Sequence, residues 1–213
     1  MRTNPFFDAW LFLIGAADYP DEIGAWKYIL VALYWGLLLG SCLIAAINWR
    51  NDPSQRDSTH VATWVCRVLI GSMWFQGCLW KLPLPVSGGF EYWTQQLEKY
   101  AAFAPHRWLV THIFLPNLSF INPLVFLAEI SFAISLILGS GVRFFAALAV
   151  LFAVHLWFGL YLHPGEWPWE YVFIAVIHVL FVAYAAGRSL GADALLRQGN
   201  YHGIFARIVA MAT

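Results

Sequence analysis

Five apolar stretches, each close to the length that crosses a bilayer, constrain this chain more than any other feature. They lie at about 27–49, 61–80, 121–139, 143–162 and 170–187. A helix needs about 20 apolar residues to span a hydrocarbon core of ~30 Å. Because 61% of the residues are hydrophobic and only 11% are charged, a water-soluble fold of this size would lack the polar surface to cover its core. The sequence therefore predicts an all-α integral membrane protein that has the lipid bilayer as a partner.

The charges indicate the orientation of the chain. The net charge is zero, and the chain has no basic surface of the kind that binds nucleic acid. Five spans place seven arginines on one side, whereas five cations on the other side are spread over longer loops. The positive-inside rule predicts that the first side is cytoplasmic. We expect the inner membrane of a bacterium or archaeon, with the N-terminus outside and the C-terminus cytoplasmic. The seven arginines are Arg50, Arg56, Arg67, Arg143, Arg188, Arg197 and Arg207, and the five cations are Arg2, Lys27, Lys81, Lys99 and Arg107.

The segments outside the spans predict interfacial helices. Residues 82–120 form the one long outer loop, and apolar positions at helical spacing within 91–104 are typical of a helix that lies on the outer interface and covers the bundle. Apolar residues among arginines in 193–210 indicate a second such helix on the inner leaflet. We divide the chain into 1–60, an N-terminal interfacial segment with the first span, 61–196 with four spans, and 197–213, an interfacial segment on the cytoplasmic face.

Three ionisable residues fall inside spans at a similar depth. Glu129 lies eight residues from Ile121, His155 lies eight from His163, and His178 lies nine from Trp169. At 1.5 Å per residue each is about 12–14 Å below the outer surface. An ionisable group at that depth needs a partner or a function, so we expect the three side chains to meet in one layer.

A carboxylate with two imidazoles allows several chemistries. The layer could relay protons or hold the polar end of a quinone, with Glu129, His155 and His178 as the catalytic and quinone-binding residues. The two histidines could instead be axial ligands of a haem b, or the three residues could ligate a metal. They could also satisfy one another and only fix helix packing. No cysteine or histidine spacing typical of zinc occurs.

Further polar residues flank this layer. Gln76 and Lys81 near the outer end of the second span are candidate cofactor-binding donors that point toward Glu129. Arg67 is expected to reach the inner headgroups along its own stem. Glu166 and Glu170 are expected to be solvated residues of an outer turn.

Several of these residues together resemble the DoxX/DoxD membrane protein family. One landmark is the run from Arg67 through Gly71 to Gly77 and Lys81, and a second is Glu129 followed by Leu138-Gly139 and Arg143. Gly187-Arg188-Ser189-Leu190 is similar to the closing Gly-Arg-Ser-Leu-Asp of many members, although two residues intervene before Asp193. The long outer loop makes DoxD, the thiosulfate:quinone oxidoreductase subunit, the nearer comparison.

The resemblance implies a four-helix membrane bundle, here with one extra N-terminal transmembrane helix, that works with a redox partner and the quinone pool. The chain has no dinucleotide fingerprint, haem-attachment motif or iron–sulfur cysteine run, so an outer-face or membrane partner subunit must donate the electrons. The alternative is a non-catalytic anchor or assembly subunit that docks on a larger membrane complex through its aromatic rim. A small-solute carrier is a third hypothesis.

Overall fold

The computed structural model describes residues 4–16, 23–199 and 201–213, and these residues form helices, turns and loops without a strand. Arg2, which the charge analysis includes, lies outside the described residues. The helices are α1 (Pro5–Leu13), α2 (Trp26–Asn51), η2 (Pro53–Gln55), α3 (Ser58–Gly77), η3 (Leu79–Lys81), α4 (Gly88–Lys99), α5 (Ala104–Leu109), η4 (Val110–Phe114), η5 (Leu115–Asn117), α6 (Leu118–Leu138), α7 (Val142–Leu160), α8 (Pro168–Ala183), η6 (Ala186–Arg188), α9 (Ala192–Arg197) and α10 (Gly203–Ala212).

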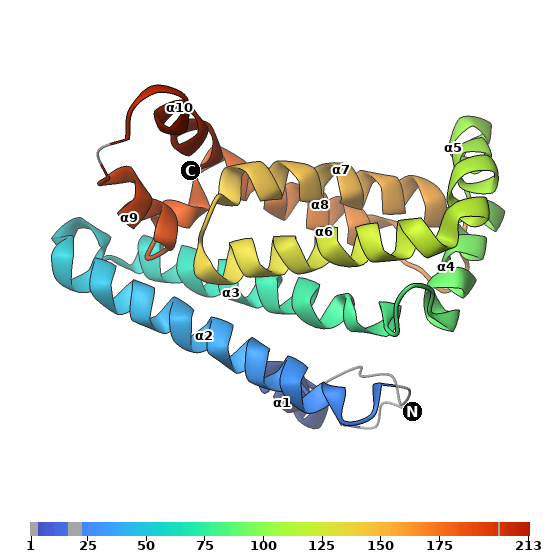
Figure 1. Cartoon of the computed structure of the whole chain (residues 1–213), viewed down its shortest axis with the longest axis horizontal. Helices are drawn as coiled ribbons and strands as arrows, with labels where there is room; N and C mark the ends of the chain where they lie inside the picture. Colours follow the sequence, from blue (N-terminus) through green and yellow to red (C-terminus); the bar gives the residue numbers. More distant parts are fainter. Residues whose placement is uncertain (1–3, 17–22, 200) are drawn as a thin grey trace.

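Four long helices, α3, α6, α7 and α8, form a bundle (Figure 1). Helix α3 packs along α6, α7 packs along α8, and α2 lies against α6 on the outside of the bundle. Helices α4 and α5 cross one end of the bundle, which we call the α4 end, and α9 and α10 lie at the other, which we call the α9 end (Figure 1). Helix α4 overlaps the segment 91–104 that was predicted to cover the bundle, and it lies across the end of the bundle.

Small residues and breakers in the sequence explain this packing. Gly71 lets α3 approach α6 so closely that an added Cβ would lie 2.8 Å from a side-chain carbon of Ile137. Gly139 ends α6 in the left-handed conformation, with φ of 72°, which glycine adopts without steric cost. Phe75, Leu136 and Val142 are fully buried between the helices.

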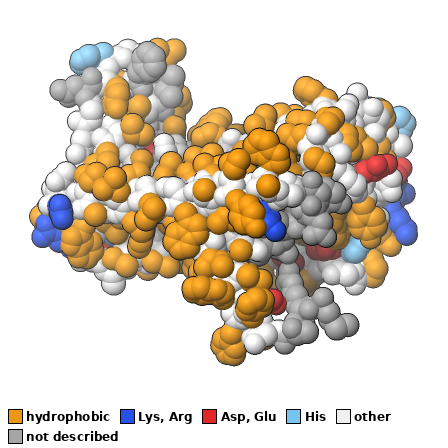
Figure 2. All heavy atoms as spheres, turned by 60° about the horizontal axis from the view of Figure 1, so that its bottom comes forward, with side chains coloured by type: hydrophobic (Ala, Val, Ile, Leu, Met, Phe, Trp, Pro, Cys, Tyr) orange, Lys and Arg blue, Asp and Glu red, His pale blue; other side chains and the backbone are white. Residues whose placement is uncertain are grey.

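Three helical stretches of the described chain are long and apolar enough to cross a membrane. They are α2, the run Ala104–Leu138 from α5 into α6, and α7, while α8 is apolar but shorter. Hydrophobic side chains predominate on the face drawn in Figure 2. On α2, for example, Ile29, Leu39 and Leu43 are each more than half exposed. Exposed apolar surface of this extent is typical of lipid contact. The structure is consistent with an all-α membrane protein.

Candidate functional site

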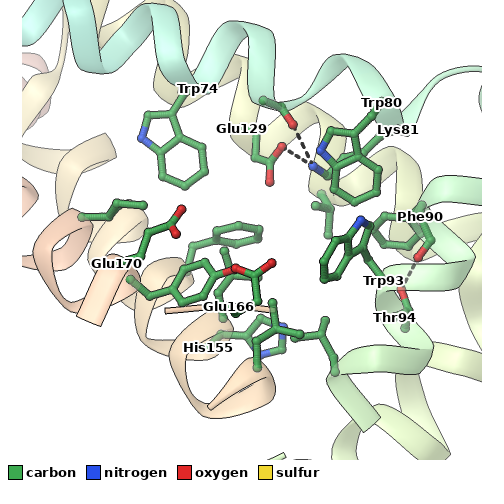
Figure 3. A pocket seen from close by; sticks show the side chains of 18 of the residues that line it. Trp74, Trp80, Lys81, Phe90, Trp93, Thr94, Glu129, His155, Glu166 and Glu170 are labelled. Atoms are coloured by element: carbon green, nitrogen blue, oxygen red, sulfur yellow. Dashed lines mark hydrogen bonds and ion pairs between the residues drawn. The ribbon is translucent and has the colours of Figure 1, made fainter. Parts of the chain in front are cut away.

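A cavity of about 510 Å³ lies inside the bundle at the α4 end (Figure 3). Its walls come from α3 and η3, α4, η4, α6, α7 and α8. Most of its surface is aromatic or aliphatic, and its polar groups are few. The aromatic lining residues are Trp74, Trp80, Phe90, Trp93, Phe114, Phe152 and Tyr171, and the ionisable ones besides Tyr171 are Lys81, Glu129, His155, Glu166 and Glu170.

Lys81 and Glu129 form a buried ion pair in one wall of this cavity. Lys81 Nζ lies 2.6 Å from Glu129 Oε2, and the two side chains are only 3% and 5% exposed. The ammonium also donates to the carbonyl of Gly77 at 3.4 Å and lies 3.9 Å from the ring centre of Trp80. The side chain of Asn122 donates to the backbone carbonyl of Lys81 at 3.0 Å. These contacts keep the Lys81 ammonium inside the bundle at a fixed position.

His155 lies in the wall opposite the ion pair (Figure 3). Its Nδ1 is 2.9 Å from Nε2 of His106 on α5, and the two rings are 4.8 Å apart. Gly159, one turn along α7, makes room for this contact, because an added Cβ there would lie 3.0 Å from His106 Cε1 and would clash with a methyl group of Leu97. The close approach of α4 and α5 to α7 therefore depends on glycine at this position.

Two further carboxylates, Glu166 and Glu170, line the cavity (Figure 3). Glu166 precedes α8 and accepts a 2.8 Å hydrogen bond from the hydroxyl of Tyr171, and Glu170 lies in the first turn of α8. Their place in a short outer turn predicts that both are solvated loop residues. In the structure Glu166 is half-buried and Glu170 is exposed, and both place a carboxyl group in the cavity lining.

His178 lies outside the cavity lining, which corrects the expectation that it meets Glu129 and His155. Its Nδ1 is 2.7 Å from the carbonyl oxygen of Ile174, and its Nε2 is 2.9 Å from the indole nitrogen of Trp74. A carbonyl accepts and an indole N–H donates, so the imidazole is neutral with its hydrogen on Nδ1. His178 is fully buried and has no nitrogen left for a quinone, a haem or a metal.

The three predicted residues therefore take separate partners: Lys81 for Glu129, His106 for His155, and Trp74 for His178. In the part of the chain that the structure describes, no three ligating side chains converge on a metal position. The cavity does bring Glu129 and His155 together with the predicted donor Lys81.

Gln76 also departs from its predicted place. Its amide donates to the backbone carbonyl of Phe12 in α1 at 2.7 Å, and it does not line the cavity. This hydrogen bond joins α3 to the N-terminal helix α1.

A second polar cluster lies at the α9 end. Arg67 is fully buried, not extended to the headgroups, and donates to the backbone carbonyls of Leu136 and Ile137 at the end of α6. Asp193 accepts from the backbone nitrogens of Gly141 and Val142 at 2.6 and 3.1 Å, which caps the start of α7. Burial raises the pKa of the Asp193 carboxyl above its ordinary value, and these two N–H donors act in the opposite direction.

The chain matches no protein-family model, no curated protein and no solved structure. The residues that carry the DoxX/DoxD resemblance nevertheless fall into two groups in space. Gly77, Lys81 and Glu129 belong to the cavity wall, and Arg67, Gly139 and Asp193 are joined by contacts at the α9 end. The first group is a candidate binding site, and the second holds the helix ends together.

His106 is the functional candidate that the sequence analysis missed. It follows Pro105 in the long loop, and its partner is 49 residues further along the chain. No local spacing links two residues so far apart. The one available signal was a histidine in the long outer loop, residues 82–120.

Proposed function

We propose that this chain is the membrane subunit of a quinone-linked redox complex and that the cavity at the α4 end binds the quinone headgroup. The observation that carries the proposal is the placement of Lys81 and His155 on opposite walls of an aromatic cavity. A quinone is a flat ring with carbonyl oxygens at opposite edges. An ammonium and an imidazole N–H across the cavity supply one donor for each oxygen, and the aromatic rings supply stacking surface.

The size of the cavity and the resemblance to the DoxX/DoxD family support the same ligand. Sites for small molecules usually enclose roughly 300–1,000 Å³, and this cavity encloses about 510 Å³. Gly77, Lys81 and Glu129, three of the residues that carry the resemblance to a quinone-linked family, are in its lining. A quinone tail would leave the site toward lipid.

In this proposal α2, α3, α6, α7 and α8 all cross the membrane. The α9 end faces the cytoplasm, because Arg50, Arg188 and Arg197 lie there, and the cavity faces the outer side. The membrane is the inner membrane of a bacterium or archaeon. A partner subunit on the outer face donates two electrons, and the quinone takes up two protons to become the quinol.

A variant that fills the cavity tests the proposal. An added side chain at Gly77 meets no atom within 4 Å at its Cβ, so Gly77→Leu should project into the cavity without disturbing α3. The matched control is Gly36→Leu on α2, where the space is equally open and the residue is exposed. Quenching of tryptophan fluorescence by a short-chain quinone measures binding, since three tryptophans line the cavity. We expect at least about tenfold weaker binding in Gly77→Leu, a loss of ~1.4 kcal/mol, and parental binding in the control. Equal binding in both variants would exclude this cavity as the site.

A non-catalytic anchor is the second candidate, and one observation favours it. Aromatic side chains at the α4 end and on α1 are strongly exposed, among them Phe6 at 85% and Trp26 at 68%. Such residues are enriched in protein interfaces and in membrane belts. For an anchor, Trp167→Ser and Trp169→Ser should release partner subunits from the purified complex while Gly77→Leu leaves its activity intact.

A further inference from the structure

The contact between His106 and His155 joins the cavity wall to the helix that covers it. A bond between two neutral imidazoles holds one hydrogen, so two arrangements exist for the 2.9 Å contact. In the first, His106 donates from Nε2, and His155 carries its own hydrogen on Nε2. In the second, His155 donates from Nδ1, and its Nε2 is a bare acceptor. Because His106 engages Nδ1 of His155, Nε2 is the nitrogen left to meet a ligand in the cavity.

The ring nitrogen of His106 that points away from His155 makes no hydrogen bond to a described residue. This nitrogen, Nδ1, is buried. The rings that pack on His106, Phe103 and Phe158, offer it no polar atom. A buried ring nitrogen without a partner costs free energy in either arrangement. The neighbouring residues Pro105 and Arg107 are exposed. The path from bulk water to His106 Nδ1, along which a proton would be exchanged, is therefore short.

We propose that His106 and His155 form a proton-transfer pair that fits the cavity to both oxidation states of a bound quinone; this inference rests on the function proposed above. In the first arrangement His155 Nε2–H donates to a quinone oxygen. When the partner subunit delivers two electrons, that hydrogen passes to the reduced oxygen, His106 Nε2–H passes to His155 Nδ1, and His106 Nδ1 takes a proton from water. The second proton of the quinol comes from the Lys81–Glu129 pair, which regains it from water.

The second arrangement then fits the product. The new quinol hydroxyl is a donor, and it faces the bare Nε2 of His155. Both arrangements carry the same number of protons, so after the quinol leaves, the pair returns to the first by exchange with water at its two ends. His155 is the catalytic residue in this scheme, and His106 is a positioning residue that acts through it.

The charged groups near the two histidines are bonded to other residues, so they do not favour one of the two hydrogen arrangements. Lys81, Glu129, Glu166 and Glu170 share the cavity with His155, and Glu98 lies on the α4 side. Lys81 and Glu129 bond to each other, and Glu166 accepts from Tyr171. Glu98 accepts from the hydroxyl of Thr111, and its backbone carbonyl accepts from Arg107. None of these groups holds either imidazole in one arrangement.

Nitrogen NMR of the ¹⁵N-histidine-labelled chain in lipid nanodiscs tests the inference without turnover. Signals of the pair are assigned by their loss in His106→Phe and His155→Gln. With a short-chain quinone, His155 Nε2 should resonate as a protonated nitrogen, and with the corresponding quinol as a bare one. His106 Nε2 should shift in the same direction. If both ligands quench tryptophan fluorescence but the signals stay unchanged, the inference fails while the proposed function stands. If neither ligand binds, both fail.

A kinetic comparison in the intact complex separates proton transfer from packing. His106→Phe keeps an aromatic ring beside Phe103 and Phe158 but removes both ring nitrogens. We expect quinone affinity within about twofold of the parent and electron transfer to quinone about 100-fold slower, the usual contribution of a positioned acid or base. The matched control is His112→Phe, since His112 is exposed and its Nδ1 lies 3.0 Å from the carbonyl oxygen of Trp108.

A second variant keeps the test decisive if His106→Phe does not fold. His106→Gln can hydrogen-bond to His155 Nδ1 through its amide but has no second nitrogen that accepts a proton. It should show the same slow electron transfer with normal quinone affinity. A parental rate in either folded variant would overturn the inference.

Discussion

The ion pair between Lys81 and Glu129 gives the sharpest test of how the cavity is built. Two unit charges 2.6 Å apart attract by about 6 kcal/mol at an effective dielectric constant of ~20. Removing one partner leaves the other charged and buried, which typically costs about 3–5 kcal/mol. We expect Lys81→Met and Glu129→Met each to destabilise the protein by that amount. The double variant, in which no charge remains, should be within about 1 kcal/mol of the parent.

Reversible unfolding in mixed detergent and SDS, followed by tryptophan fluorescence, measures these free energies. The control is Lys99→Met, an exposed lysine on α4 for which we expect a change below about 0.5 kcal/mol. The account of a desolvated ion pair would be refuted if each single substitution lowered the free energy of unfolding by less than about 1 kcal/mol and the double variant lost the sum of the two values. The double variant also separates stability from function, because it should fold yet bind quinone at least about tenfold more weakly for lack of the Lys81 donor.

Three further substitutions test other contacts. Asp193→Ala removes the two hydrogen bonds at the start of α7 and should cost about 1 kcal/mol of unfolding free energy, measured in the same detergent titration. Gly159→Leu forces α4 away from α7 at Leu97, and quinone quenching should weaken while hydrogen exchange in α4 increases; unchanged exchange would contradict the close packing. Trp74→Phe leaves Nε2 of His178 without a donor and should lower the melting temperature by an amount equivalent to about 1–3 kcal/mol, without a change in His106 signals.

The positions of the long helices follow from the sequence. Apolar runs of membrane length, bounded by Gly139 to Gly141 at one turn and by Pro168 at another, predict α2, α3, α6, α7 and α8 to within a few residues. These features are local, because a helix needs only its own residues to satisfy its backbone in lipid. The covering helix α4 was predictable for the same reason, from the spacing of its apolar side chains.

The partners within the site were not predictable in this way. Depth along a helix comes from counting residues, but the direction in which a side chain points depends on rotation about the helix axis. Glu129, His155 and His178 have similar predicted depths, yet His178 bonds to Trp74 and is not in the cavity lining. Of the two donors expected to point toward Glu129, Lys81 does so, whereas the amide of Gln76 donates to the carbonyl of Phe12 instead. Tertiary packing decides such choices, and a single sequence does not encode it in any local spacing.

The burial of Arg67 has a consequence for how the chain enters the membrane during synthesis. Helix α3 has 20 residues but is not among the stretches apolar enough to span by themselves, and an arginine near a helix centre costs about 2.5–3.5 kcal/mol at the translocon. The carbonyls that accept from Arg67 belong to Leu136 and Ile137, and Leu136 is 69 residues later in the chain. We therefore expect α3 to remain beside the translocon until α6 has been made, and then to enter lipid together with it. Chains truncated before α6 should leave α3 uninserted in a glycosylation-mapping assay.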